Sequence, residues 1–287
     1  MASAVSNFLG LPRELSDPGS ARYVVLPVPY EGTVTWGVGT AAGPAAIIAA
    51  SDHIEWFDEE LRGEFHGAGV ATADPIPPAD TPQEQARRVR AAAEGFFAQG
   101  KFLLALGGEH GITPPLVAAA ARQYDGLSVL QIDAHADLRD QYQGGPLSHA
   151  CVMRRVLEVT DRVAQVGIRS FCREAFEQCP RQVANFITPQ MVAEDARWIE
   201  KALDLLGERV YVTIDMDGFD PAEAPGVGTP QPGGLRYGDV TRLLRRLCAA
   251  RQVVAADVVE TRPILPSNTT ELLAARLAYK IIAYTQC

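Results

Sequence analysis

The chain has 287 residues, of which 47% are hydrophobic, so it is long enough to bury one large core. Its formal net charge is -9, and it contains no run rich in lysine and arginine. Binding of nucleic acid requires a basic face that neutralises phosphates, so this composition argues against a nucleic-acid-binding protein. The negative charge instead suits a small cationic ligand.

No stretch approaches the roughly 20 apolar residues that cross a bilayer, which argues against a membrane protein. Residues 1–20 contain no basic segment leading into an apolar core, so we expect a cytoplasmic protein. The cysteines are odd in number, scattered and without a CxxC pair, and we expect reduced thiols rather than disulfides or a thiolate zinc site. They are Cys151, Cys172, Cys179, Cys248 and Cys287.

Apolar, β-branched runs alternate with helical patterns along the chain, which is typical of a parallel sheet flanked by helices. The expected strands are residues 22–27, 102–106, 128–132, 162–167, 183–187, 210–214 and 253–259, with a weakly marked eighth at 67–73. Proline at or near the first helical position predicts helices that begin near Gly43, Thr81 and Thr113. An apolar stripe predicts a last helix after Thr269 and Thr270.

The sequence contains no internal repeat, low-complexity tract or linker that would divide it. We therefore predict a single α/β domain over residues 1–287. Its expected architecture is a three-layer αβα fold with a mostly parallel sheet of about eight strands.

Carboxylate and imidazole side chains follow four of the expected strands. Because ligands gather at the carboxyl ends of parallel strands, these residues predict one site. They are Glu109 and His110, then Asp133, His135 and Asp137, then Asp215 and Asp217, and finally Glu260.

The two imidazoles and four aspartates of this set are enough to hold two divalent ions about 3.5 to 4 Å apart. Oxygen and imidazole ligands without thiolates suit manganese, and less selectively zinc, iron or cobalt. The odd spacing of Asp133, His135 and Asp137 places their side chains on one side of an extended segment. The alternative is that these aspartates only cap the helices that follow them, and that the histidines are hydrogen-bonded within the core.

Charge counting indicates the substrate class. Two divalent ions contribute +4, four aspartates contribute -4, and a metal-bound hydroxide leaves the cluster negative even before Glu260 is added. Such a site attracts a cation and repels a phosphate. Coordination lowers the pKa of water from near 16 toward about 7, which supplies hydroxide at neutral pH.

These motifs resemble the ureohydrolase family, which includes arginase and agmatinase. The resemblance is carried, in the family's order, by residues 107–110, 133–137, 213–221 and 225–230. Residues 26–51 resemble the family's amino-terminal segment and residues 256–263 its last active-site strand. About the first 20 residues are unmatched and are expected to form an N-terminal extension of an arginase-like fold.

The resemblance implies a binuclear manganese centre with Mn(II), two per chain. Asp133 and Asp215 would bridge the ions, and Asp137 would also accept a hydrogen bond from the bridging hydroxide that attacks the guanidinium carbon. The implied ligands are His110, Asp133, Asp137 and Asp215 for one ion and His135, Asp133, Asp215 and Asp217 for the other.

The resemblance also implies two residues that act on the substrate. Glu260 matches the carboxylate that grips the planar guanidinium, although an ion pair with Arg262 is the plain alternative. His149 matches the proton-shuttling histidine, with an ordinary helix-start histidine as the alternative. Cys151 lies nearby, but no base partner marks it as a nucleophile.

Arg139 stands where arginases tend to carry an asparagine, so the chain looks more like agmatinases, which hydrolyse agmatine to putrescine and urea. The second cation of agmatine would need a contact at the mouth of the pocket, for which Asp140, Tyr142 and residues 58–60 are candidates. Guanidinobutyrate stays open because Arg139 can pair with a carboxylate, and aminopropylagmatine and arginine are further alternatives.

Two readings from other classes stand beside this one. A deacetylase on a similar fold would keep one zinc ion and fewer ligands, and a non-catalytic binding or regulatory subunit would use metal only structurally. Metal content would separate the deacetylase from a ureohydrolase, and the intact ligand set from His110 to Glu260 argues against the non-catalytic subunit. The family resemblance further suggests a homo-oligomer, a trimer or hexamer.

Overall fold

A seven-stranded sheet in the order β4-β1-β5-β9-β8-β6-β7 forms the centre of the computed structural model, which describes residues 7–287. All neighbouring strands are parallel. The strands are β1 (Tyr23–Val28), β4 (Val70–Thr72), β5 (Phe102–Gly107), β6 (Leu127–Ile132), β7 (Val163–Val166), β8 (Arg209–Asp215) and β9 (Gln252–Val259). A separate hairpin pairs β2 (Phe57–Asp58) with β3 (Gly63–Glu64).

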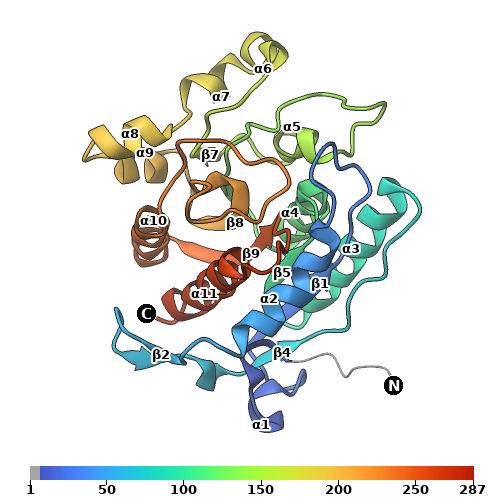
Figure 1. Cartoon of the computed structure of the whole chain (residues 1–287), viewed down its shortest axis with the longest axis vertical. Helices are drawn as coiled ribbons and strands as arrows, with labels where there is room; N and C mark the ends of the chain where they lie inside the picture. The colour runs from blue at the N-terminus through green and yellow to red at the C-terminus, as the bar shows by residue number, and fades with distance from the viewer. Residues whose placement is uncertain (1–6) are drawn as a thin grey trace.

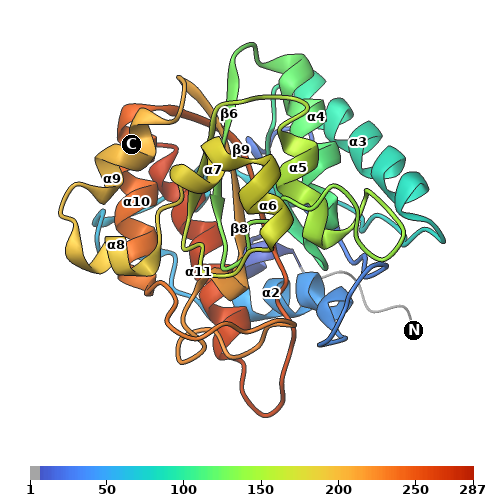
Figure 2. The ribbon, with the colours of Figure 1, turned by 90° about the horizontal axis from the view of Figure 1, so that it is seen from above.

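Helices cover both faces of the sheet, so its strands are buried on both sides and are continuously apolar (Figures 1 and 2). One layer consists of α2 (Gly43–Ser51), α9 (Trp198–Asp204), α10 (Tyr237–Ala250) and α11 (Thr269–Tyr284). The opposite layer consists of α3 (Pro82–Ala98), α4 (Thr113–Gln123), α5 (Val152–Val156) and α6 (Arg173–Gln178). The predicted three-layer αβα fold is therefore confirmed.

Short helices make up most of the connections. The α-helical ones are α1 (Arg13–Ser16), α7 (Pro180–Ala184) and α8 (Pro189–Glu194). The 3-10 turns are η1 (Phe8–Gly10), η2 (Thr40–Ala42), η3 (His66–Ala68), η4 (His110–Ile112), η5 (His149–Cys151) and η6 (Met216–Gly218).

One expected strand is wrong, so the sheet has seven strands rather than about eight. Residues 183–187 do not form a strand, because Pro180 starts α7 at its first position and the chain stays helical to Ala184. Only Ile187 reaches the sheet, through an isolated bridge to Val166. The weakly marked segment 67–73 does contain a strand, the short edge strand β4.

The other strand predictions are confirmed to within one residue at each end, and the four predicted helix starts are confirmed. Thr81 illustrates the local cause, because its side chain accepts a hydrogen bond from the backbone N–H of Glu84 at the start of α3.

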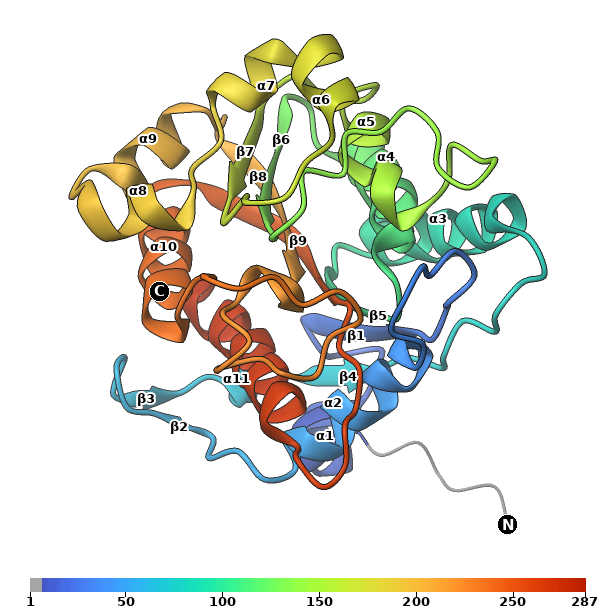
Figure 3. The same ribbon diagram turned by 45° about the horizontal axis from the view of Figure 1, so that its top comes forward.

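Strand order decides where the polar residues meet. The strands β5, β9, β8 and β6 are consecutive neighbours in the sheet although β6 and β7 separate β5 from β8 along the chain. Their carboxyl ends therefore lie at one edge, as in other open parallel sheets that bind ligands there. Figure 3 shows the loops after β8 and β9 passing side by side over this edge, where Arg262 N–H donates to the carbonyl of Gly226.

The described part of the amino-terminal segment packs against the domain. Phe8 and Leu9 are buried, and their backbone N–H groups donate to Thr72 Oγ1 and Ser51 Oγ, each at 2.8 Å. Among residues 7–287, no helix combines the length and apolar content that crossing a membrane requires.

We predict that Phe8→Ala lowers the free energy of unfolding by about 3 to 5 kcal/mol, because it leaves a cavity in the core that η1 shares with α2. Urea unfolding at fixed protein concentration measures this change. The control Arg13→Ala removes an exposed side chain from the same segment and should change stability by less than about 0.5 kcal/mol. Equal stability of the two variants would contradict the packing role of residues 7–20.

Candidate metal centre

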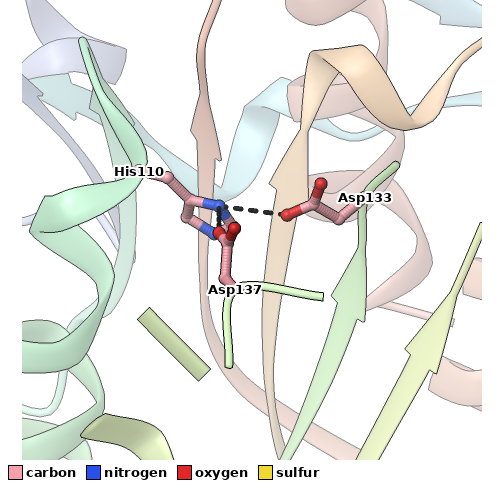
Figure 4. A group of neighbouring side chains, drawn as sticks. All are labelled: His110, Asp133 and Asp137. Carbon is pink, nitrogen blue, oxygen red and sulfur yellow. Dashed lines mark ion pairs between the residues drawn. The ribbon is translucent and has the colours of Figure 1, made fainter. Parts of the chain in front are cut away.

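A buried histidine faces three carboxylates at the carboxyl edge of the sheet. His110 begins η4 shortly after the end of β5, and its Nδ1 lies 3.2 Å from Asp133 Oδ2 and 3.1 Å from Asp137 Oδ2 (Figure 4). Asp215 Oδ2, at the end of β8, lies 3.3 Å from the same nitrogen. Side chains that follow three different strands therefore converge on one point.

A second group adjoins the first through Asp133. His135 Nδ1 lies 3.0 Å from Asp217 Oδ2 and 3.7 Å from Asp133 Oδ1. In the groups His110–Asp133–Asp137 and Asp133–His135–Asp217, one ligand atom per residue lies within 4.8 Å of the others. Two cation-binding groups that share a carboxylate are the arrangement of a binuclear centre.

The hydrogen bonds around His110 favour a metal ligand at Nδ1. Thr213 Oγ1 donates to Asp257 Oδ1 at 2.6 Å, so its oxygen accepts from His110 Nε2 at 2.9 Å. A ring hydrogen therefore sits on Nε2, and Nδ1 is the atom that can offer a lone pair to a bound cation. That buried Nδ1 makes no hydrogen bond although three carboxylates surround it, which fits a position beside a cation.

Electrostatics of the cluster show an excess of negative charge. Burial, followed by repulsion from Asp133, raises the pKa of Asp137 to about 6. Burial and the charge of Asp217 likewise hold the pKa of Asp215 well above its usual range. Burial disfavours protonation of His135, yet the carboxylates of Asp217 and Asp133 raise its pKa to about 12. Carboxylates packed this closely are stabilised by bound cations.

Two residues of the site hold a backbone conformation that only glycine adopts freely. Asp137 has φ 50° and Glu260 has φ 63°. Such residues cost about 1 to 3 kcal/mol each and cluster at functional sites. The carbonyl of Asp137 accepts from the N–H groups of Met153 and Arg154, and Glu260 N–H donates to Gly108 at 2.8 Å, which together fix both turns.

A cavity of about 180 Å³ opens above the two cation-binding groups. Its wall includes Glu260, whose Oε1 accepts from His110 N–H at 2.7 Å, an interaction made in place of the ion pair with Arg262 that the sequence left open. The full lining is Thr35, His110, His135, Asp137, Arg139, Tyr142, His149, Ala150, Asp215, Asp217, Thr229 and Glu260.

His149 lies in the cavity wall at the start of η5, in the long connection after β6 and not next to the end of a strand. Burial, with the nearby imidazoles of His110 and His135, lowers the pKa of His149 to about 4, so its ring is neutral at neutral pH. Its ring meets Tyr142 edge-on at 5.8 Å. Cys151, two residues further along, is buried, and burial raises its pKa to about 11, which leaves a neutral thiol.

Only some of the candidate contacts for the far end of a substrate line the cavity. Arg139 and Tyr142 line the cavity, with the guanidinium 5.1 Å from the ring centre. Asp140 does not line it, because its carboxylate pairs with Arg155 Nη2 at 2.6 Å. The acidic residues 58–60 lie at the β2–β3 hairpin, where Asp58 and Glu60 pair with the buried Lys280 of α11.

Comparison with known proteins identifies the family. Residues 21–283 match the model of the arginase family. The chain belongs to the arginase family. An N(1)-aminopropylagmatine ureohydrolase of Synechocystis is 39% identical over 274 residues, covering 92% of this chain and 89% of the relative. A Bacillus subtilis agmatinase is 32% identical over 266 residues, covering 91% of this chain and 90% of the relative.

A solved structure shares both the fold and the sequence pattern of this ureohydrolase. The crystal structure of agmatine ureohydrolase of Thermoplasma volcanium superposes with a TM-score of 0.89 at 32% identity, covering 99% of this chain and 96% of that one. This arginase-family chain is therefore a hydrolase acting on guanidino compounds, and its fold is the arginase-like αβα architecture.

Arg169 is a further residue at the site of this ureohydrolase, and no role is assigned to it from the sequence. It is half-buried and donates to the carbonyls of Asp217 at 2.9 Å and Gln231 at 2.7 Å, among other backbone oxygens. It thereby ties the turn that carries Asp217 to the following loop, where Thr229 Oγ1 donates to Asp217 Oδ2 at 2.9 Å. No motif marks such a residue, because its partners are backbone carbonyls contributed by distant segments.

We predict that Arg169→Ala lowers the affinity for Mn²⁺ about 10- to 100-fold, the range typical of residues that orient metal ligands. Titration calorimetry with the metal-free protein measures this affinity. Arg242→Ala is the matched control, since Arg242 is exposed and pairs with Asp239 on α10. Equal affinity in both variants would show that Arg169 does not hold the Asp217 turn in place.

Proposed function

We propose that this ureohydrolase hydrolyses agmatine to putrescine and urea with two manganese ions bound at the carboxylate cluster. The observation that carries the proposal is the pair of cation-binding groups joined by Asp133 at the base of a cavity that Glu260 also lines. Relatives named agmatinase or agmatine ureohydrolase support the choice of substrate.

The residues that would hold the ions are those brought together at the sheet edge. Their oxygen and imidazole atoms suit manganese better than a thiophilic metal. When bound, the ions lower the pKa of a coordinated water to about 7 and so supply hydroxide at neutral pH. One ion would take His110, Asp133, Asp137 and Asp215, and the other His135, Asp133, Asp215 and Asp217.

Glu260 would orient the guanidinium of the substrate. Its Oε1 is held by the backbone N–H of His110, while no hydrogen bond within residues 7–287 uses Oε2. A carboxylate fixed in this way presents a planar pair of acceptors to a planar cation. Burial raises the pKa of Glu260 to about 8, so a bound cation favours its ionised form.

His149 would carry the proton to the leaving amine. Because its ring is neutral and lies in the cavity wall, it can accept a proton during attack and deliver it to the nitrogen that departs. The products are then urea and a primary amine.

Arg139 supports a second candidate, a guanidino acid such as guanidinobutyrate. Its guanidinium lines the cavity and, within the described part of the chain, contacts the ring of Tyr142 but no carboxylate. A cation in this place attracts a distal carboxylate and repels the distal ammonium of agmatine. Aminopropylagmatine is a further alternative, supported by the Synechocystis relative. We also infer that the protein is cytoplasmic and, from the resemblance to the family, that it is a homo-oligomer, a trimer or hexamer.

We predict that the manganese-loaded protein releases urea from agmatine and that chelation abolishes this activity, because the nucleophile depends on the ions. Urea release from agmatine, aminopropylagmatine, guanidinobutyrate and arginine is the measurement. Absence of urea from every one of these compounds would reject the proposal.

The variants His135→Ala and His53→Ala make the same experiment specific for the site. His135→Ala removes one ligand and should lower kcat at least about 100-fold, whereas the exposed His53 lies outside the cluster and its loss should leave kcat unchanged.

We predict that Arg139→Gln discriminates between the two substrate classes. If Arg139 binds a distal carboxylate, the variant loses about 10- to 100-fold in kcat/KM for guanidinobutyrate and gains for agmatine, as expected for a charged hydrogen bond. Arg154→Gln is the control, since Arg154 lies outside the cavity lining. An unchanged ratio of the two kcat/KM values would remove Arg139 from substrate selection.

A further inference from the structure

The hydroxyl of Thr33 joins the cavity histidine to a buried carboxylate. Thr33 lies in the loop between β1 and α2, and its Oγ1 is 3.2 Å from His149 Nδ1 and 3.1 Å from the backbone nitrogen of His149. The same oxygen donates to Glu109 Oε1 at 2.9 Å. Three segments that are distant in sequence therefore meet at one hydroxyl group.

The surroundings of Glu109 fix the direction of these bonds. Glu109 Oε2 accepts from the backbone N–H groups of Gly32 at 2.7 Å and Thr33 at 2.6 Å, and Oε1 accepts from the Thr33 hydroxyl. Thr33 has a single hydroxyl hydrogen, and that hydrogen is used toward Glu109. Both contacts between Thr33 and His149 must then have the threonine oxygen as acceptor.

We propose that Thr33 and Glu109 are positioning residues that hold His149 in the tautomer with its hydrogen on Nδ1, which leaves the lone pair of Nε2 free for proton transfer. The proposal rests on the proposed proton-carrying role of His149. In this tautomer Nδ1–H donates to Thr33, and Nε2, on the opposite side of the ring, is the atom that accepts and returns a proton.

The carboxylate is placed too firmly to leave this position. Glu109 is fully buried, and a Cβ added at Gly111 would lie only 2.6 Å from its Oε1. The edge-on ring of Tyr142 further restricts rotation of the His149 ring. Ser148 Oγ lies 3.4 Å from His149 Nδ1, which is longer than the Thr33 contact, and it can accept the same hydrogen.

The arrangement repeats the one beneath the metal ligand His110. There Asp257 takes the hydroxyl hydrogen of Thr213, and Thr213 accepts from the ring of His110. In both cases a buried carboxylate accepts the only hydroxyl hydrogen of a threonine, so that the threonine oxygen can only accept from the histidine ring. This determines which ring nitrogen faces the threonine with a hydrogen and which faces the cavity. For His110 the atom left to bind a cation is Nδ1, and for His149 the bare atom is Nε2.

Nitrogen NMR of the full chain tests the tautomer without any reference to turnover. The protein is labelled with ¹⁵N-histidine and loaded with Zn²⁺, which is diamagnetic, and the His149 signals are identified by their loss in His149→Gln. We expect a protonated Nδ1 and a bare Nε2 in the wild type and in Thr33→Ser, which keeps the hydroxyl. Thr33→Val keeps the shape without the hydroxyl and should show a shift of the hydrogen toward Nε2.

Turnover provides the second readout. Thr33→Val should lower kcat for urea release about 10- to 100-fold with KM changed less than about twofold, and Thr33→Ser should restore most of the rate. Ser148→Ala is the matched control, because it removes the neighbouring hydroxyl and should leave the tautomer unchanged.

A bare Nδ1 in the wild type would overturn the proposal, because it would mean that Glu109 is protonated and that Thr33 donates to the ring. An unchanged tautomer in Thr33→Val would overturn it as well. If Thr33→Val does not fold, the wild-type and Thr33→Ser spectra still decide. If the wild type releases no urea from any guanidino compound, the proposed function fails while the tautomer result stands on its own.

Discussion

The crowding of buried carboxylates around two imidazoles is the constraint on which the rest of this structure depends. Asp133, Asp137 and Asp215 approach one nitrogen of His110 within 3.1 to 3.3 Å. Carboxylates gathered around one atom repel one another strongly in a buried environment, and bound cations relieve the repulsion. The strained backbone at Asp137 and Glu260 and the loops clamped by Arg169 serve to keep these groups together.

Threonine hydroxyl groups determine which nitrogen of two histidine rings at this site faces the cavity. His110 and His149 each contact a threonine whose hydroxyl hydrogen is donated to a buried carboxylate. The threonine can then only accept, so the ring presents a defined nitrogen to the cavity. In our proposal, the same arrangement of hydrogen bonds serves metal binding at His110 and proton transfer at His149.

Much of the fold was predictable because hydrophobic periodicity and proline placement are local signals. The segment 183–187 shows the limit of such signals, since its apolar residues belong partly to α7 and partly to a single bridge at Ile187. Periodicity does not distinguish a short helix that packs against a sheet edge from a strand that joins it. Asp140 and residues 58–60 show a similar limit. The sequence shows their negative charge, but it does not show that Asp140 pairs with Arg155 and Asp58 with Lys280 instead of lining the cavity.

The sequence by itself determined the αβα architecture and the chemical character of the site, because metal-binding residue types stand directly after apolar strands in a recognisable spacing. The tertiary structure alone decided which residues act together. It placed β5 beside β9 and β8 beside β6, so that side chains more than 100 residues apart share one cavity. It also revealed Thr33, Thr213, Asp257 and Arg169, whose contributions arise from hydrogen bonds between distant segments and carry no local pattern.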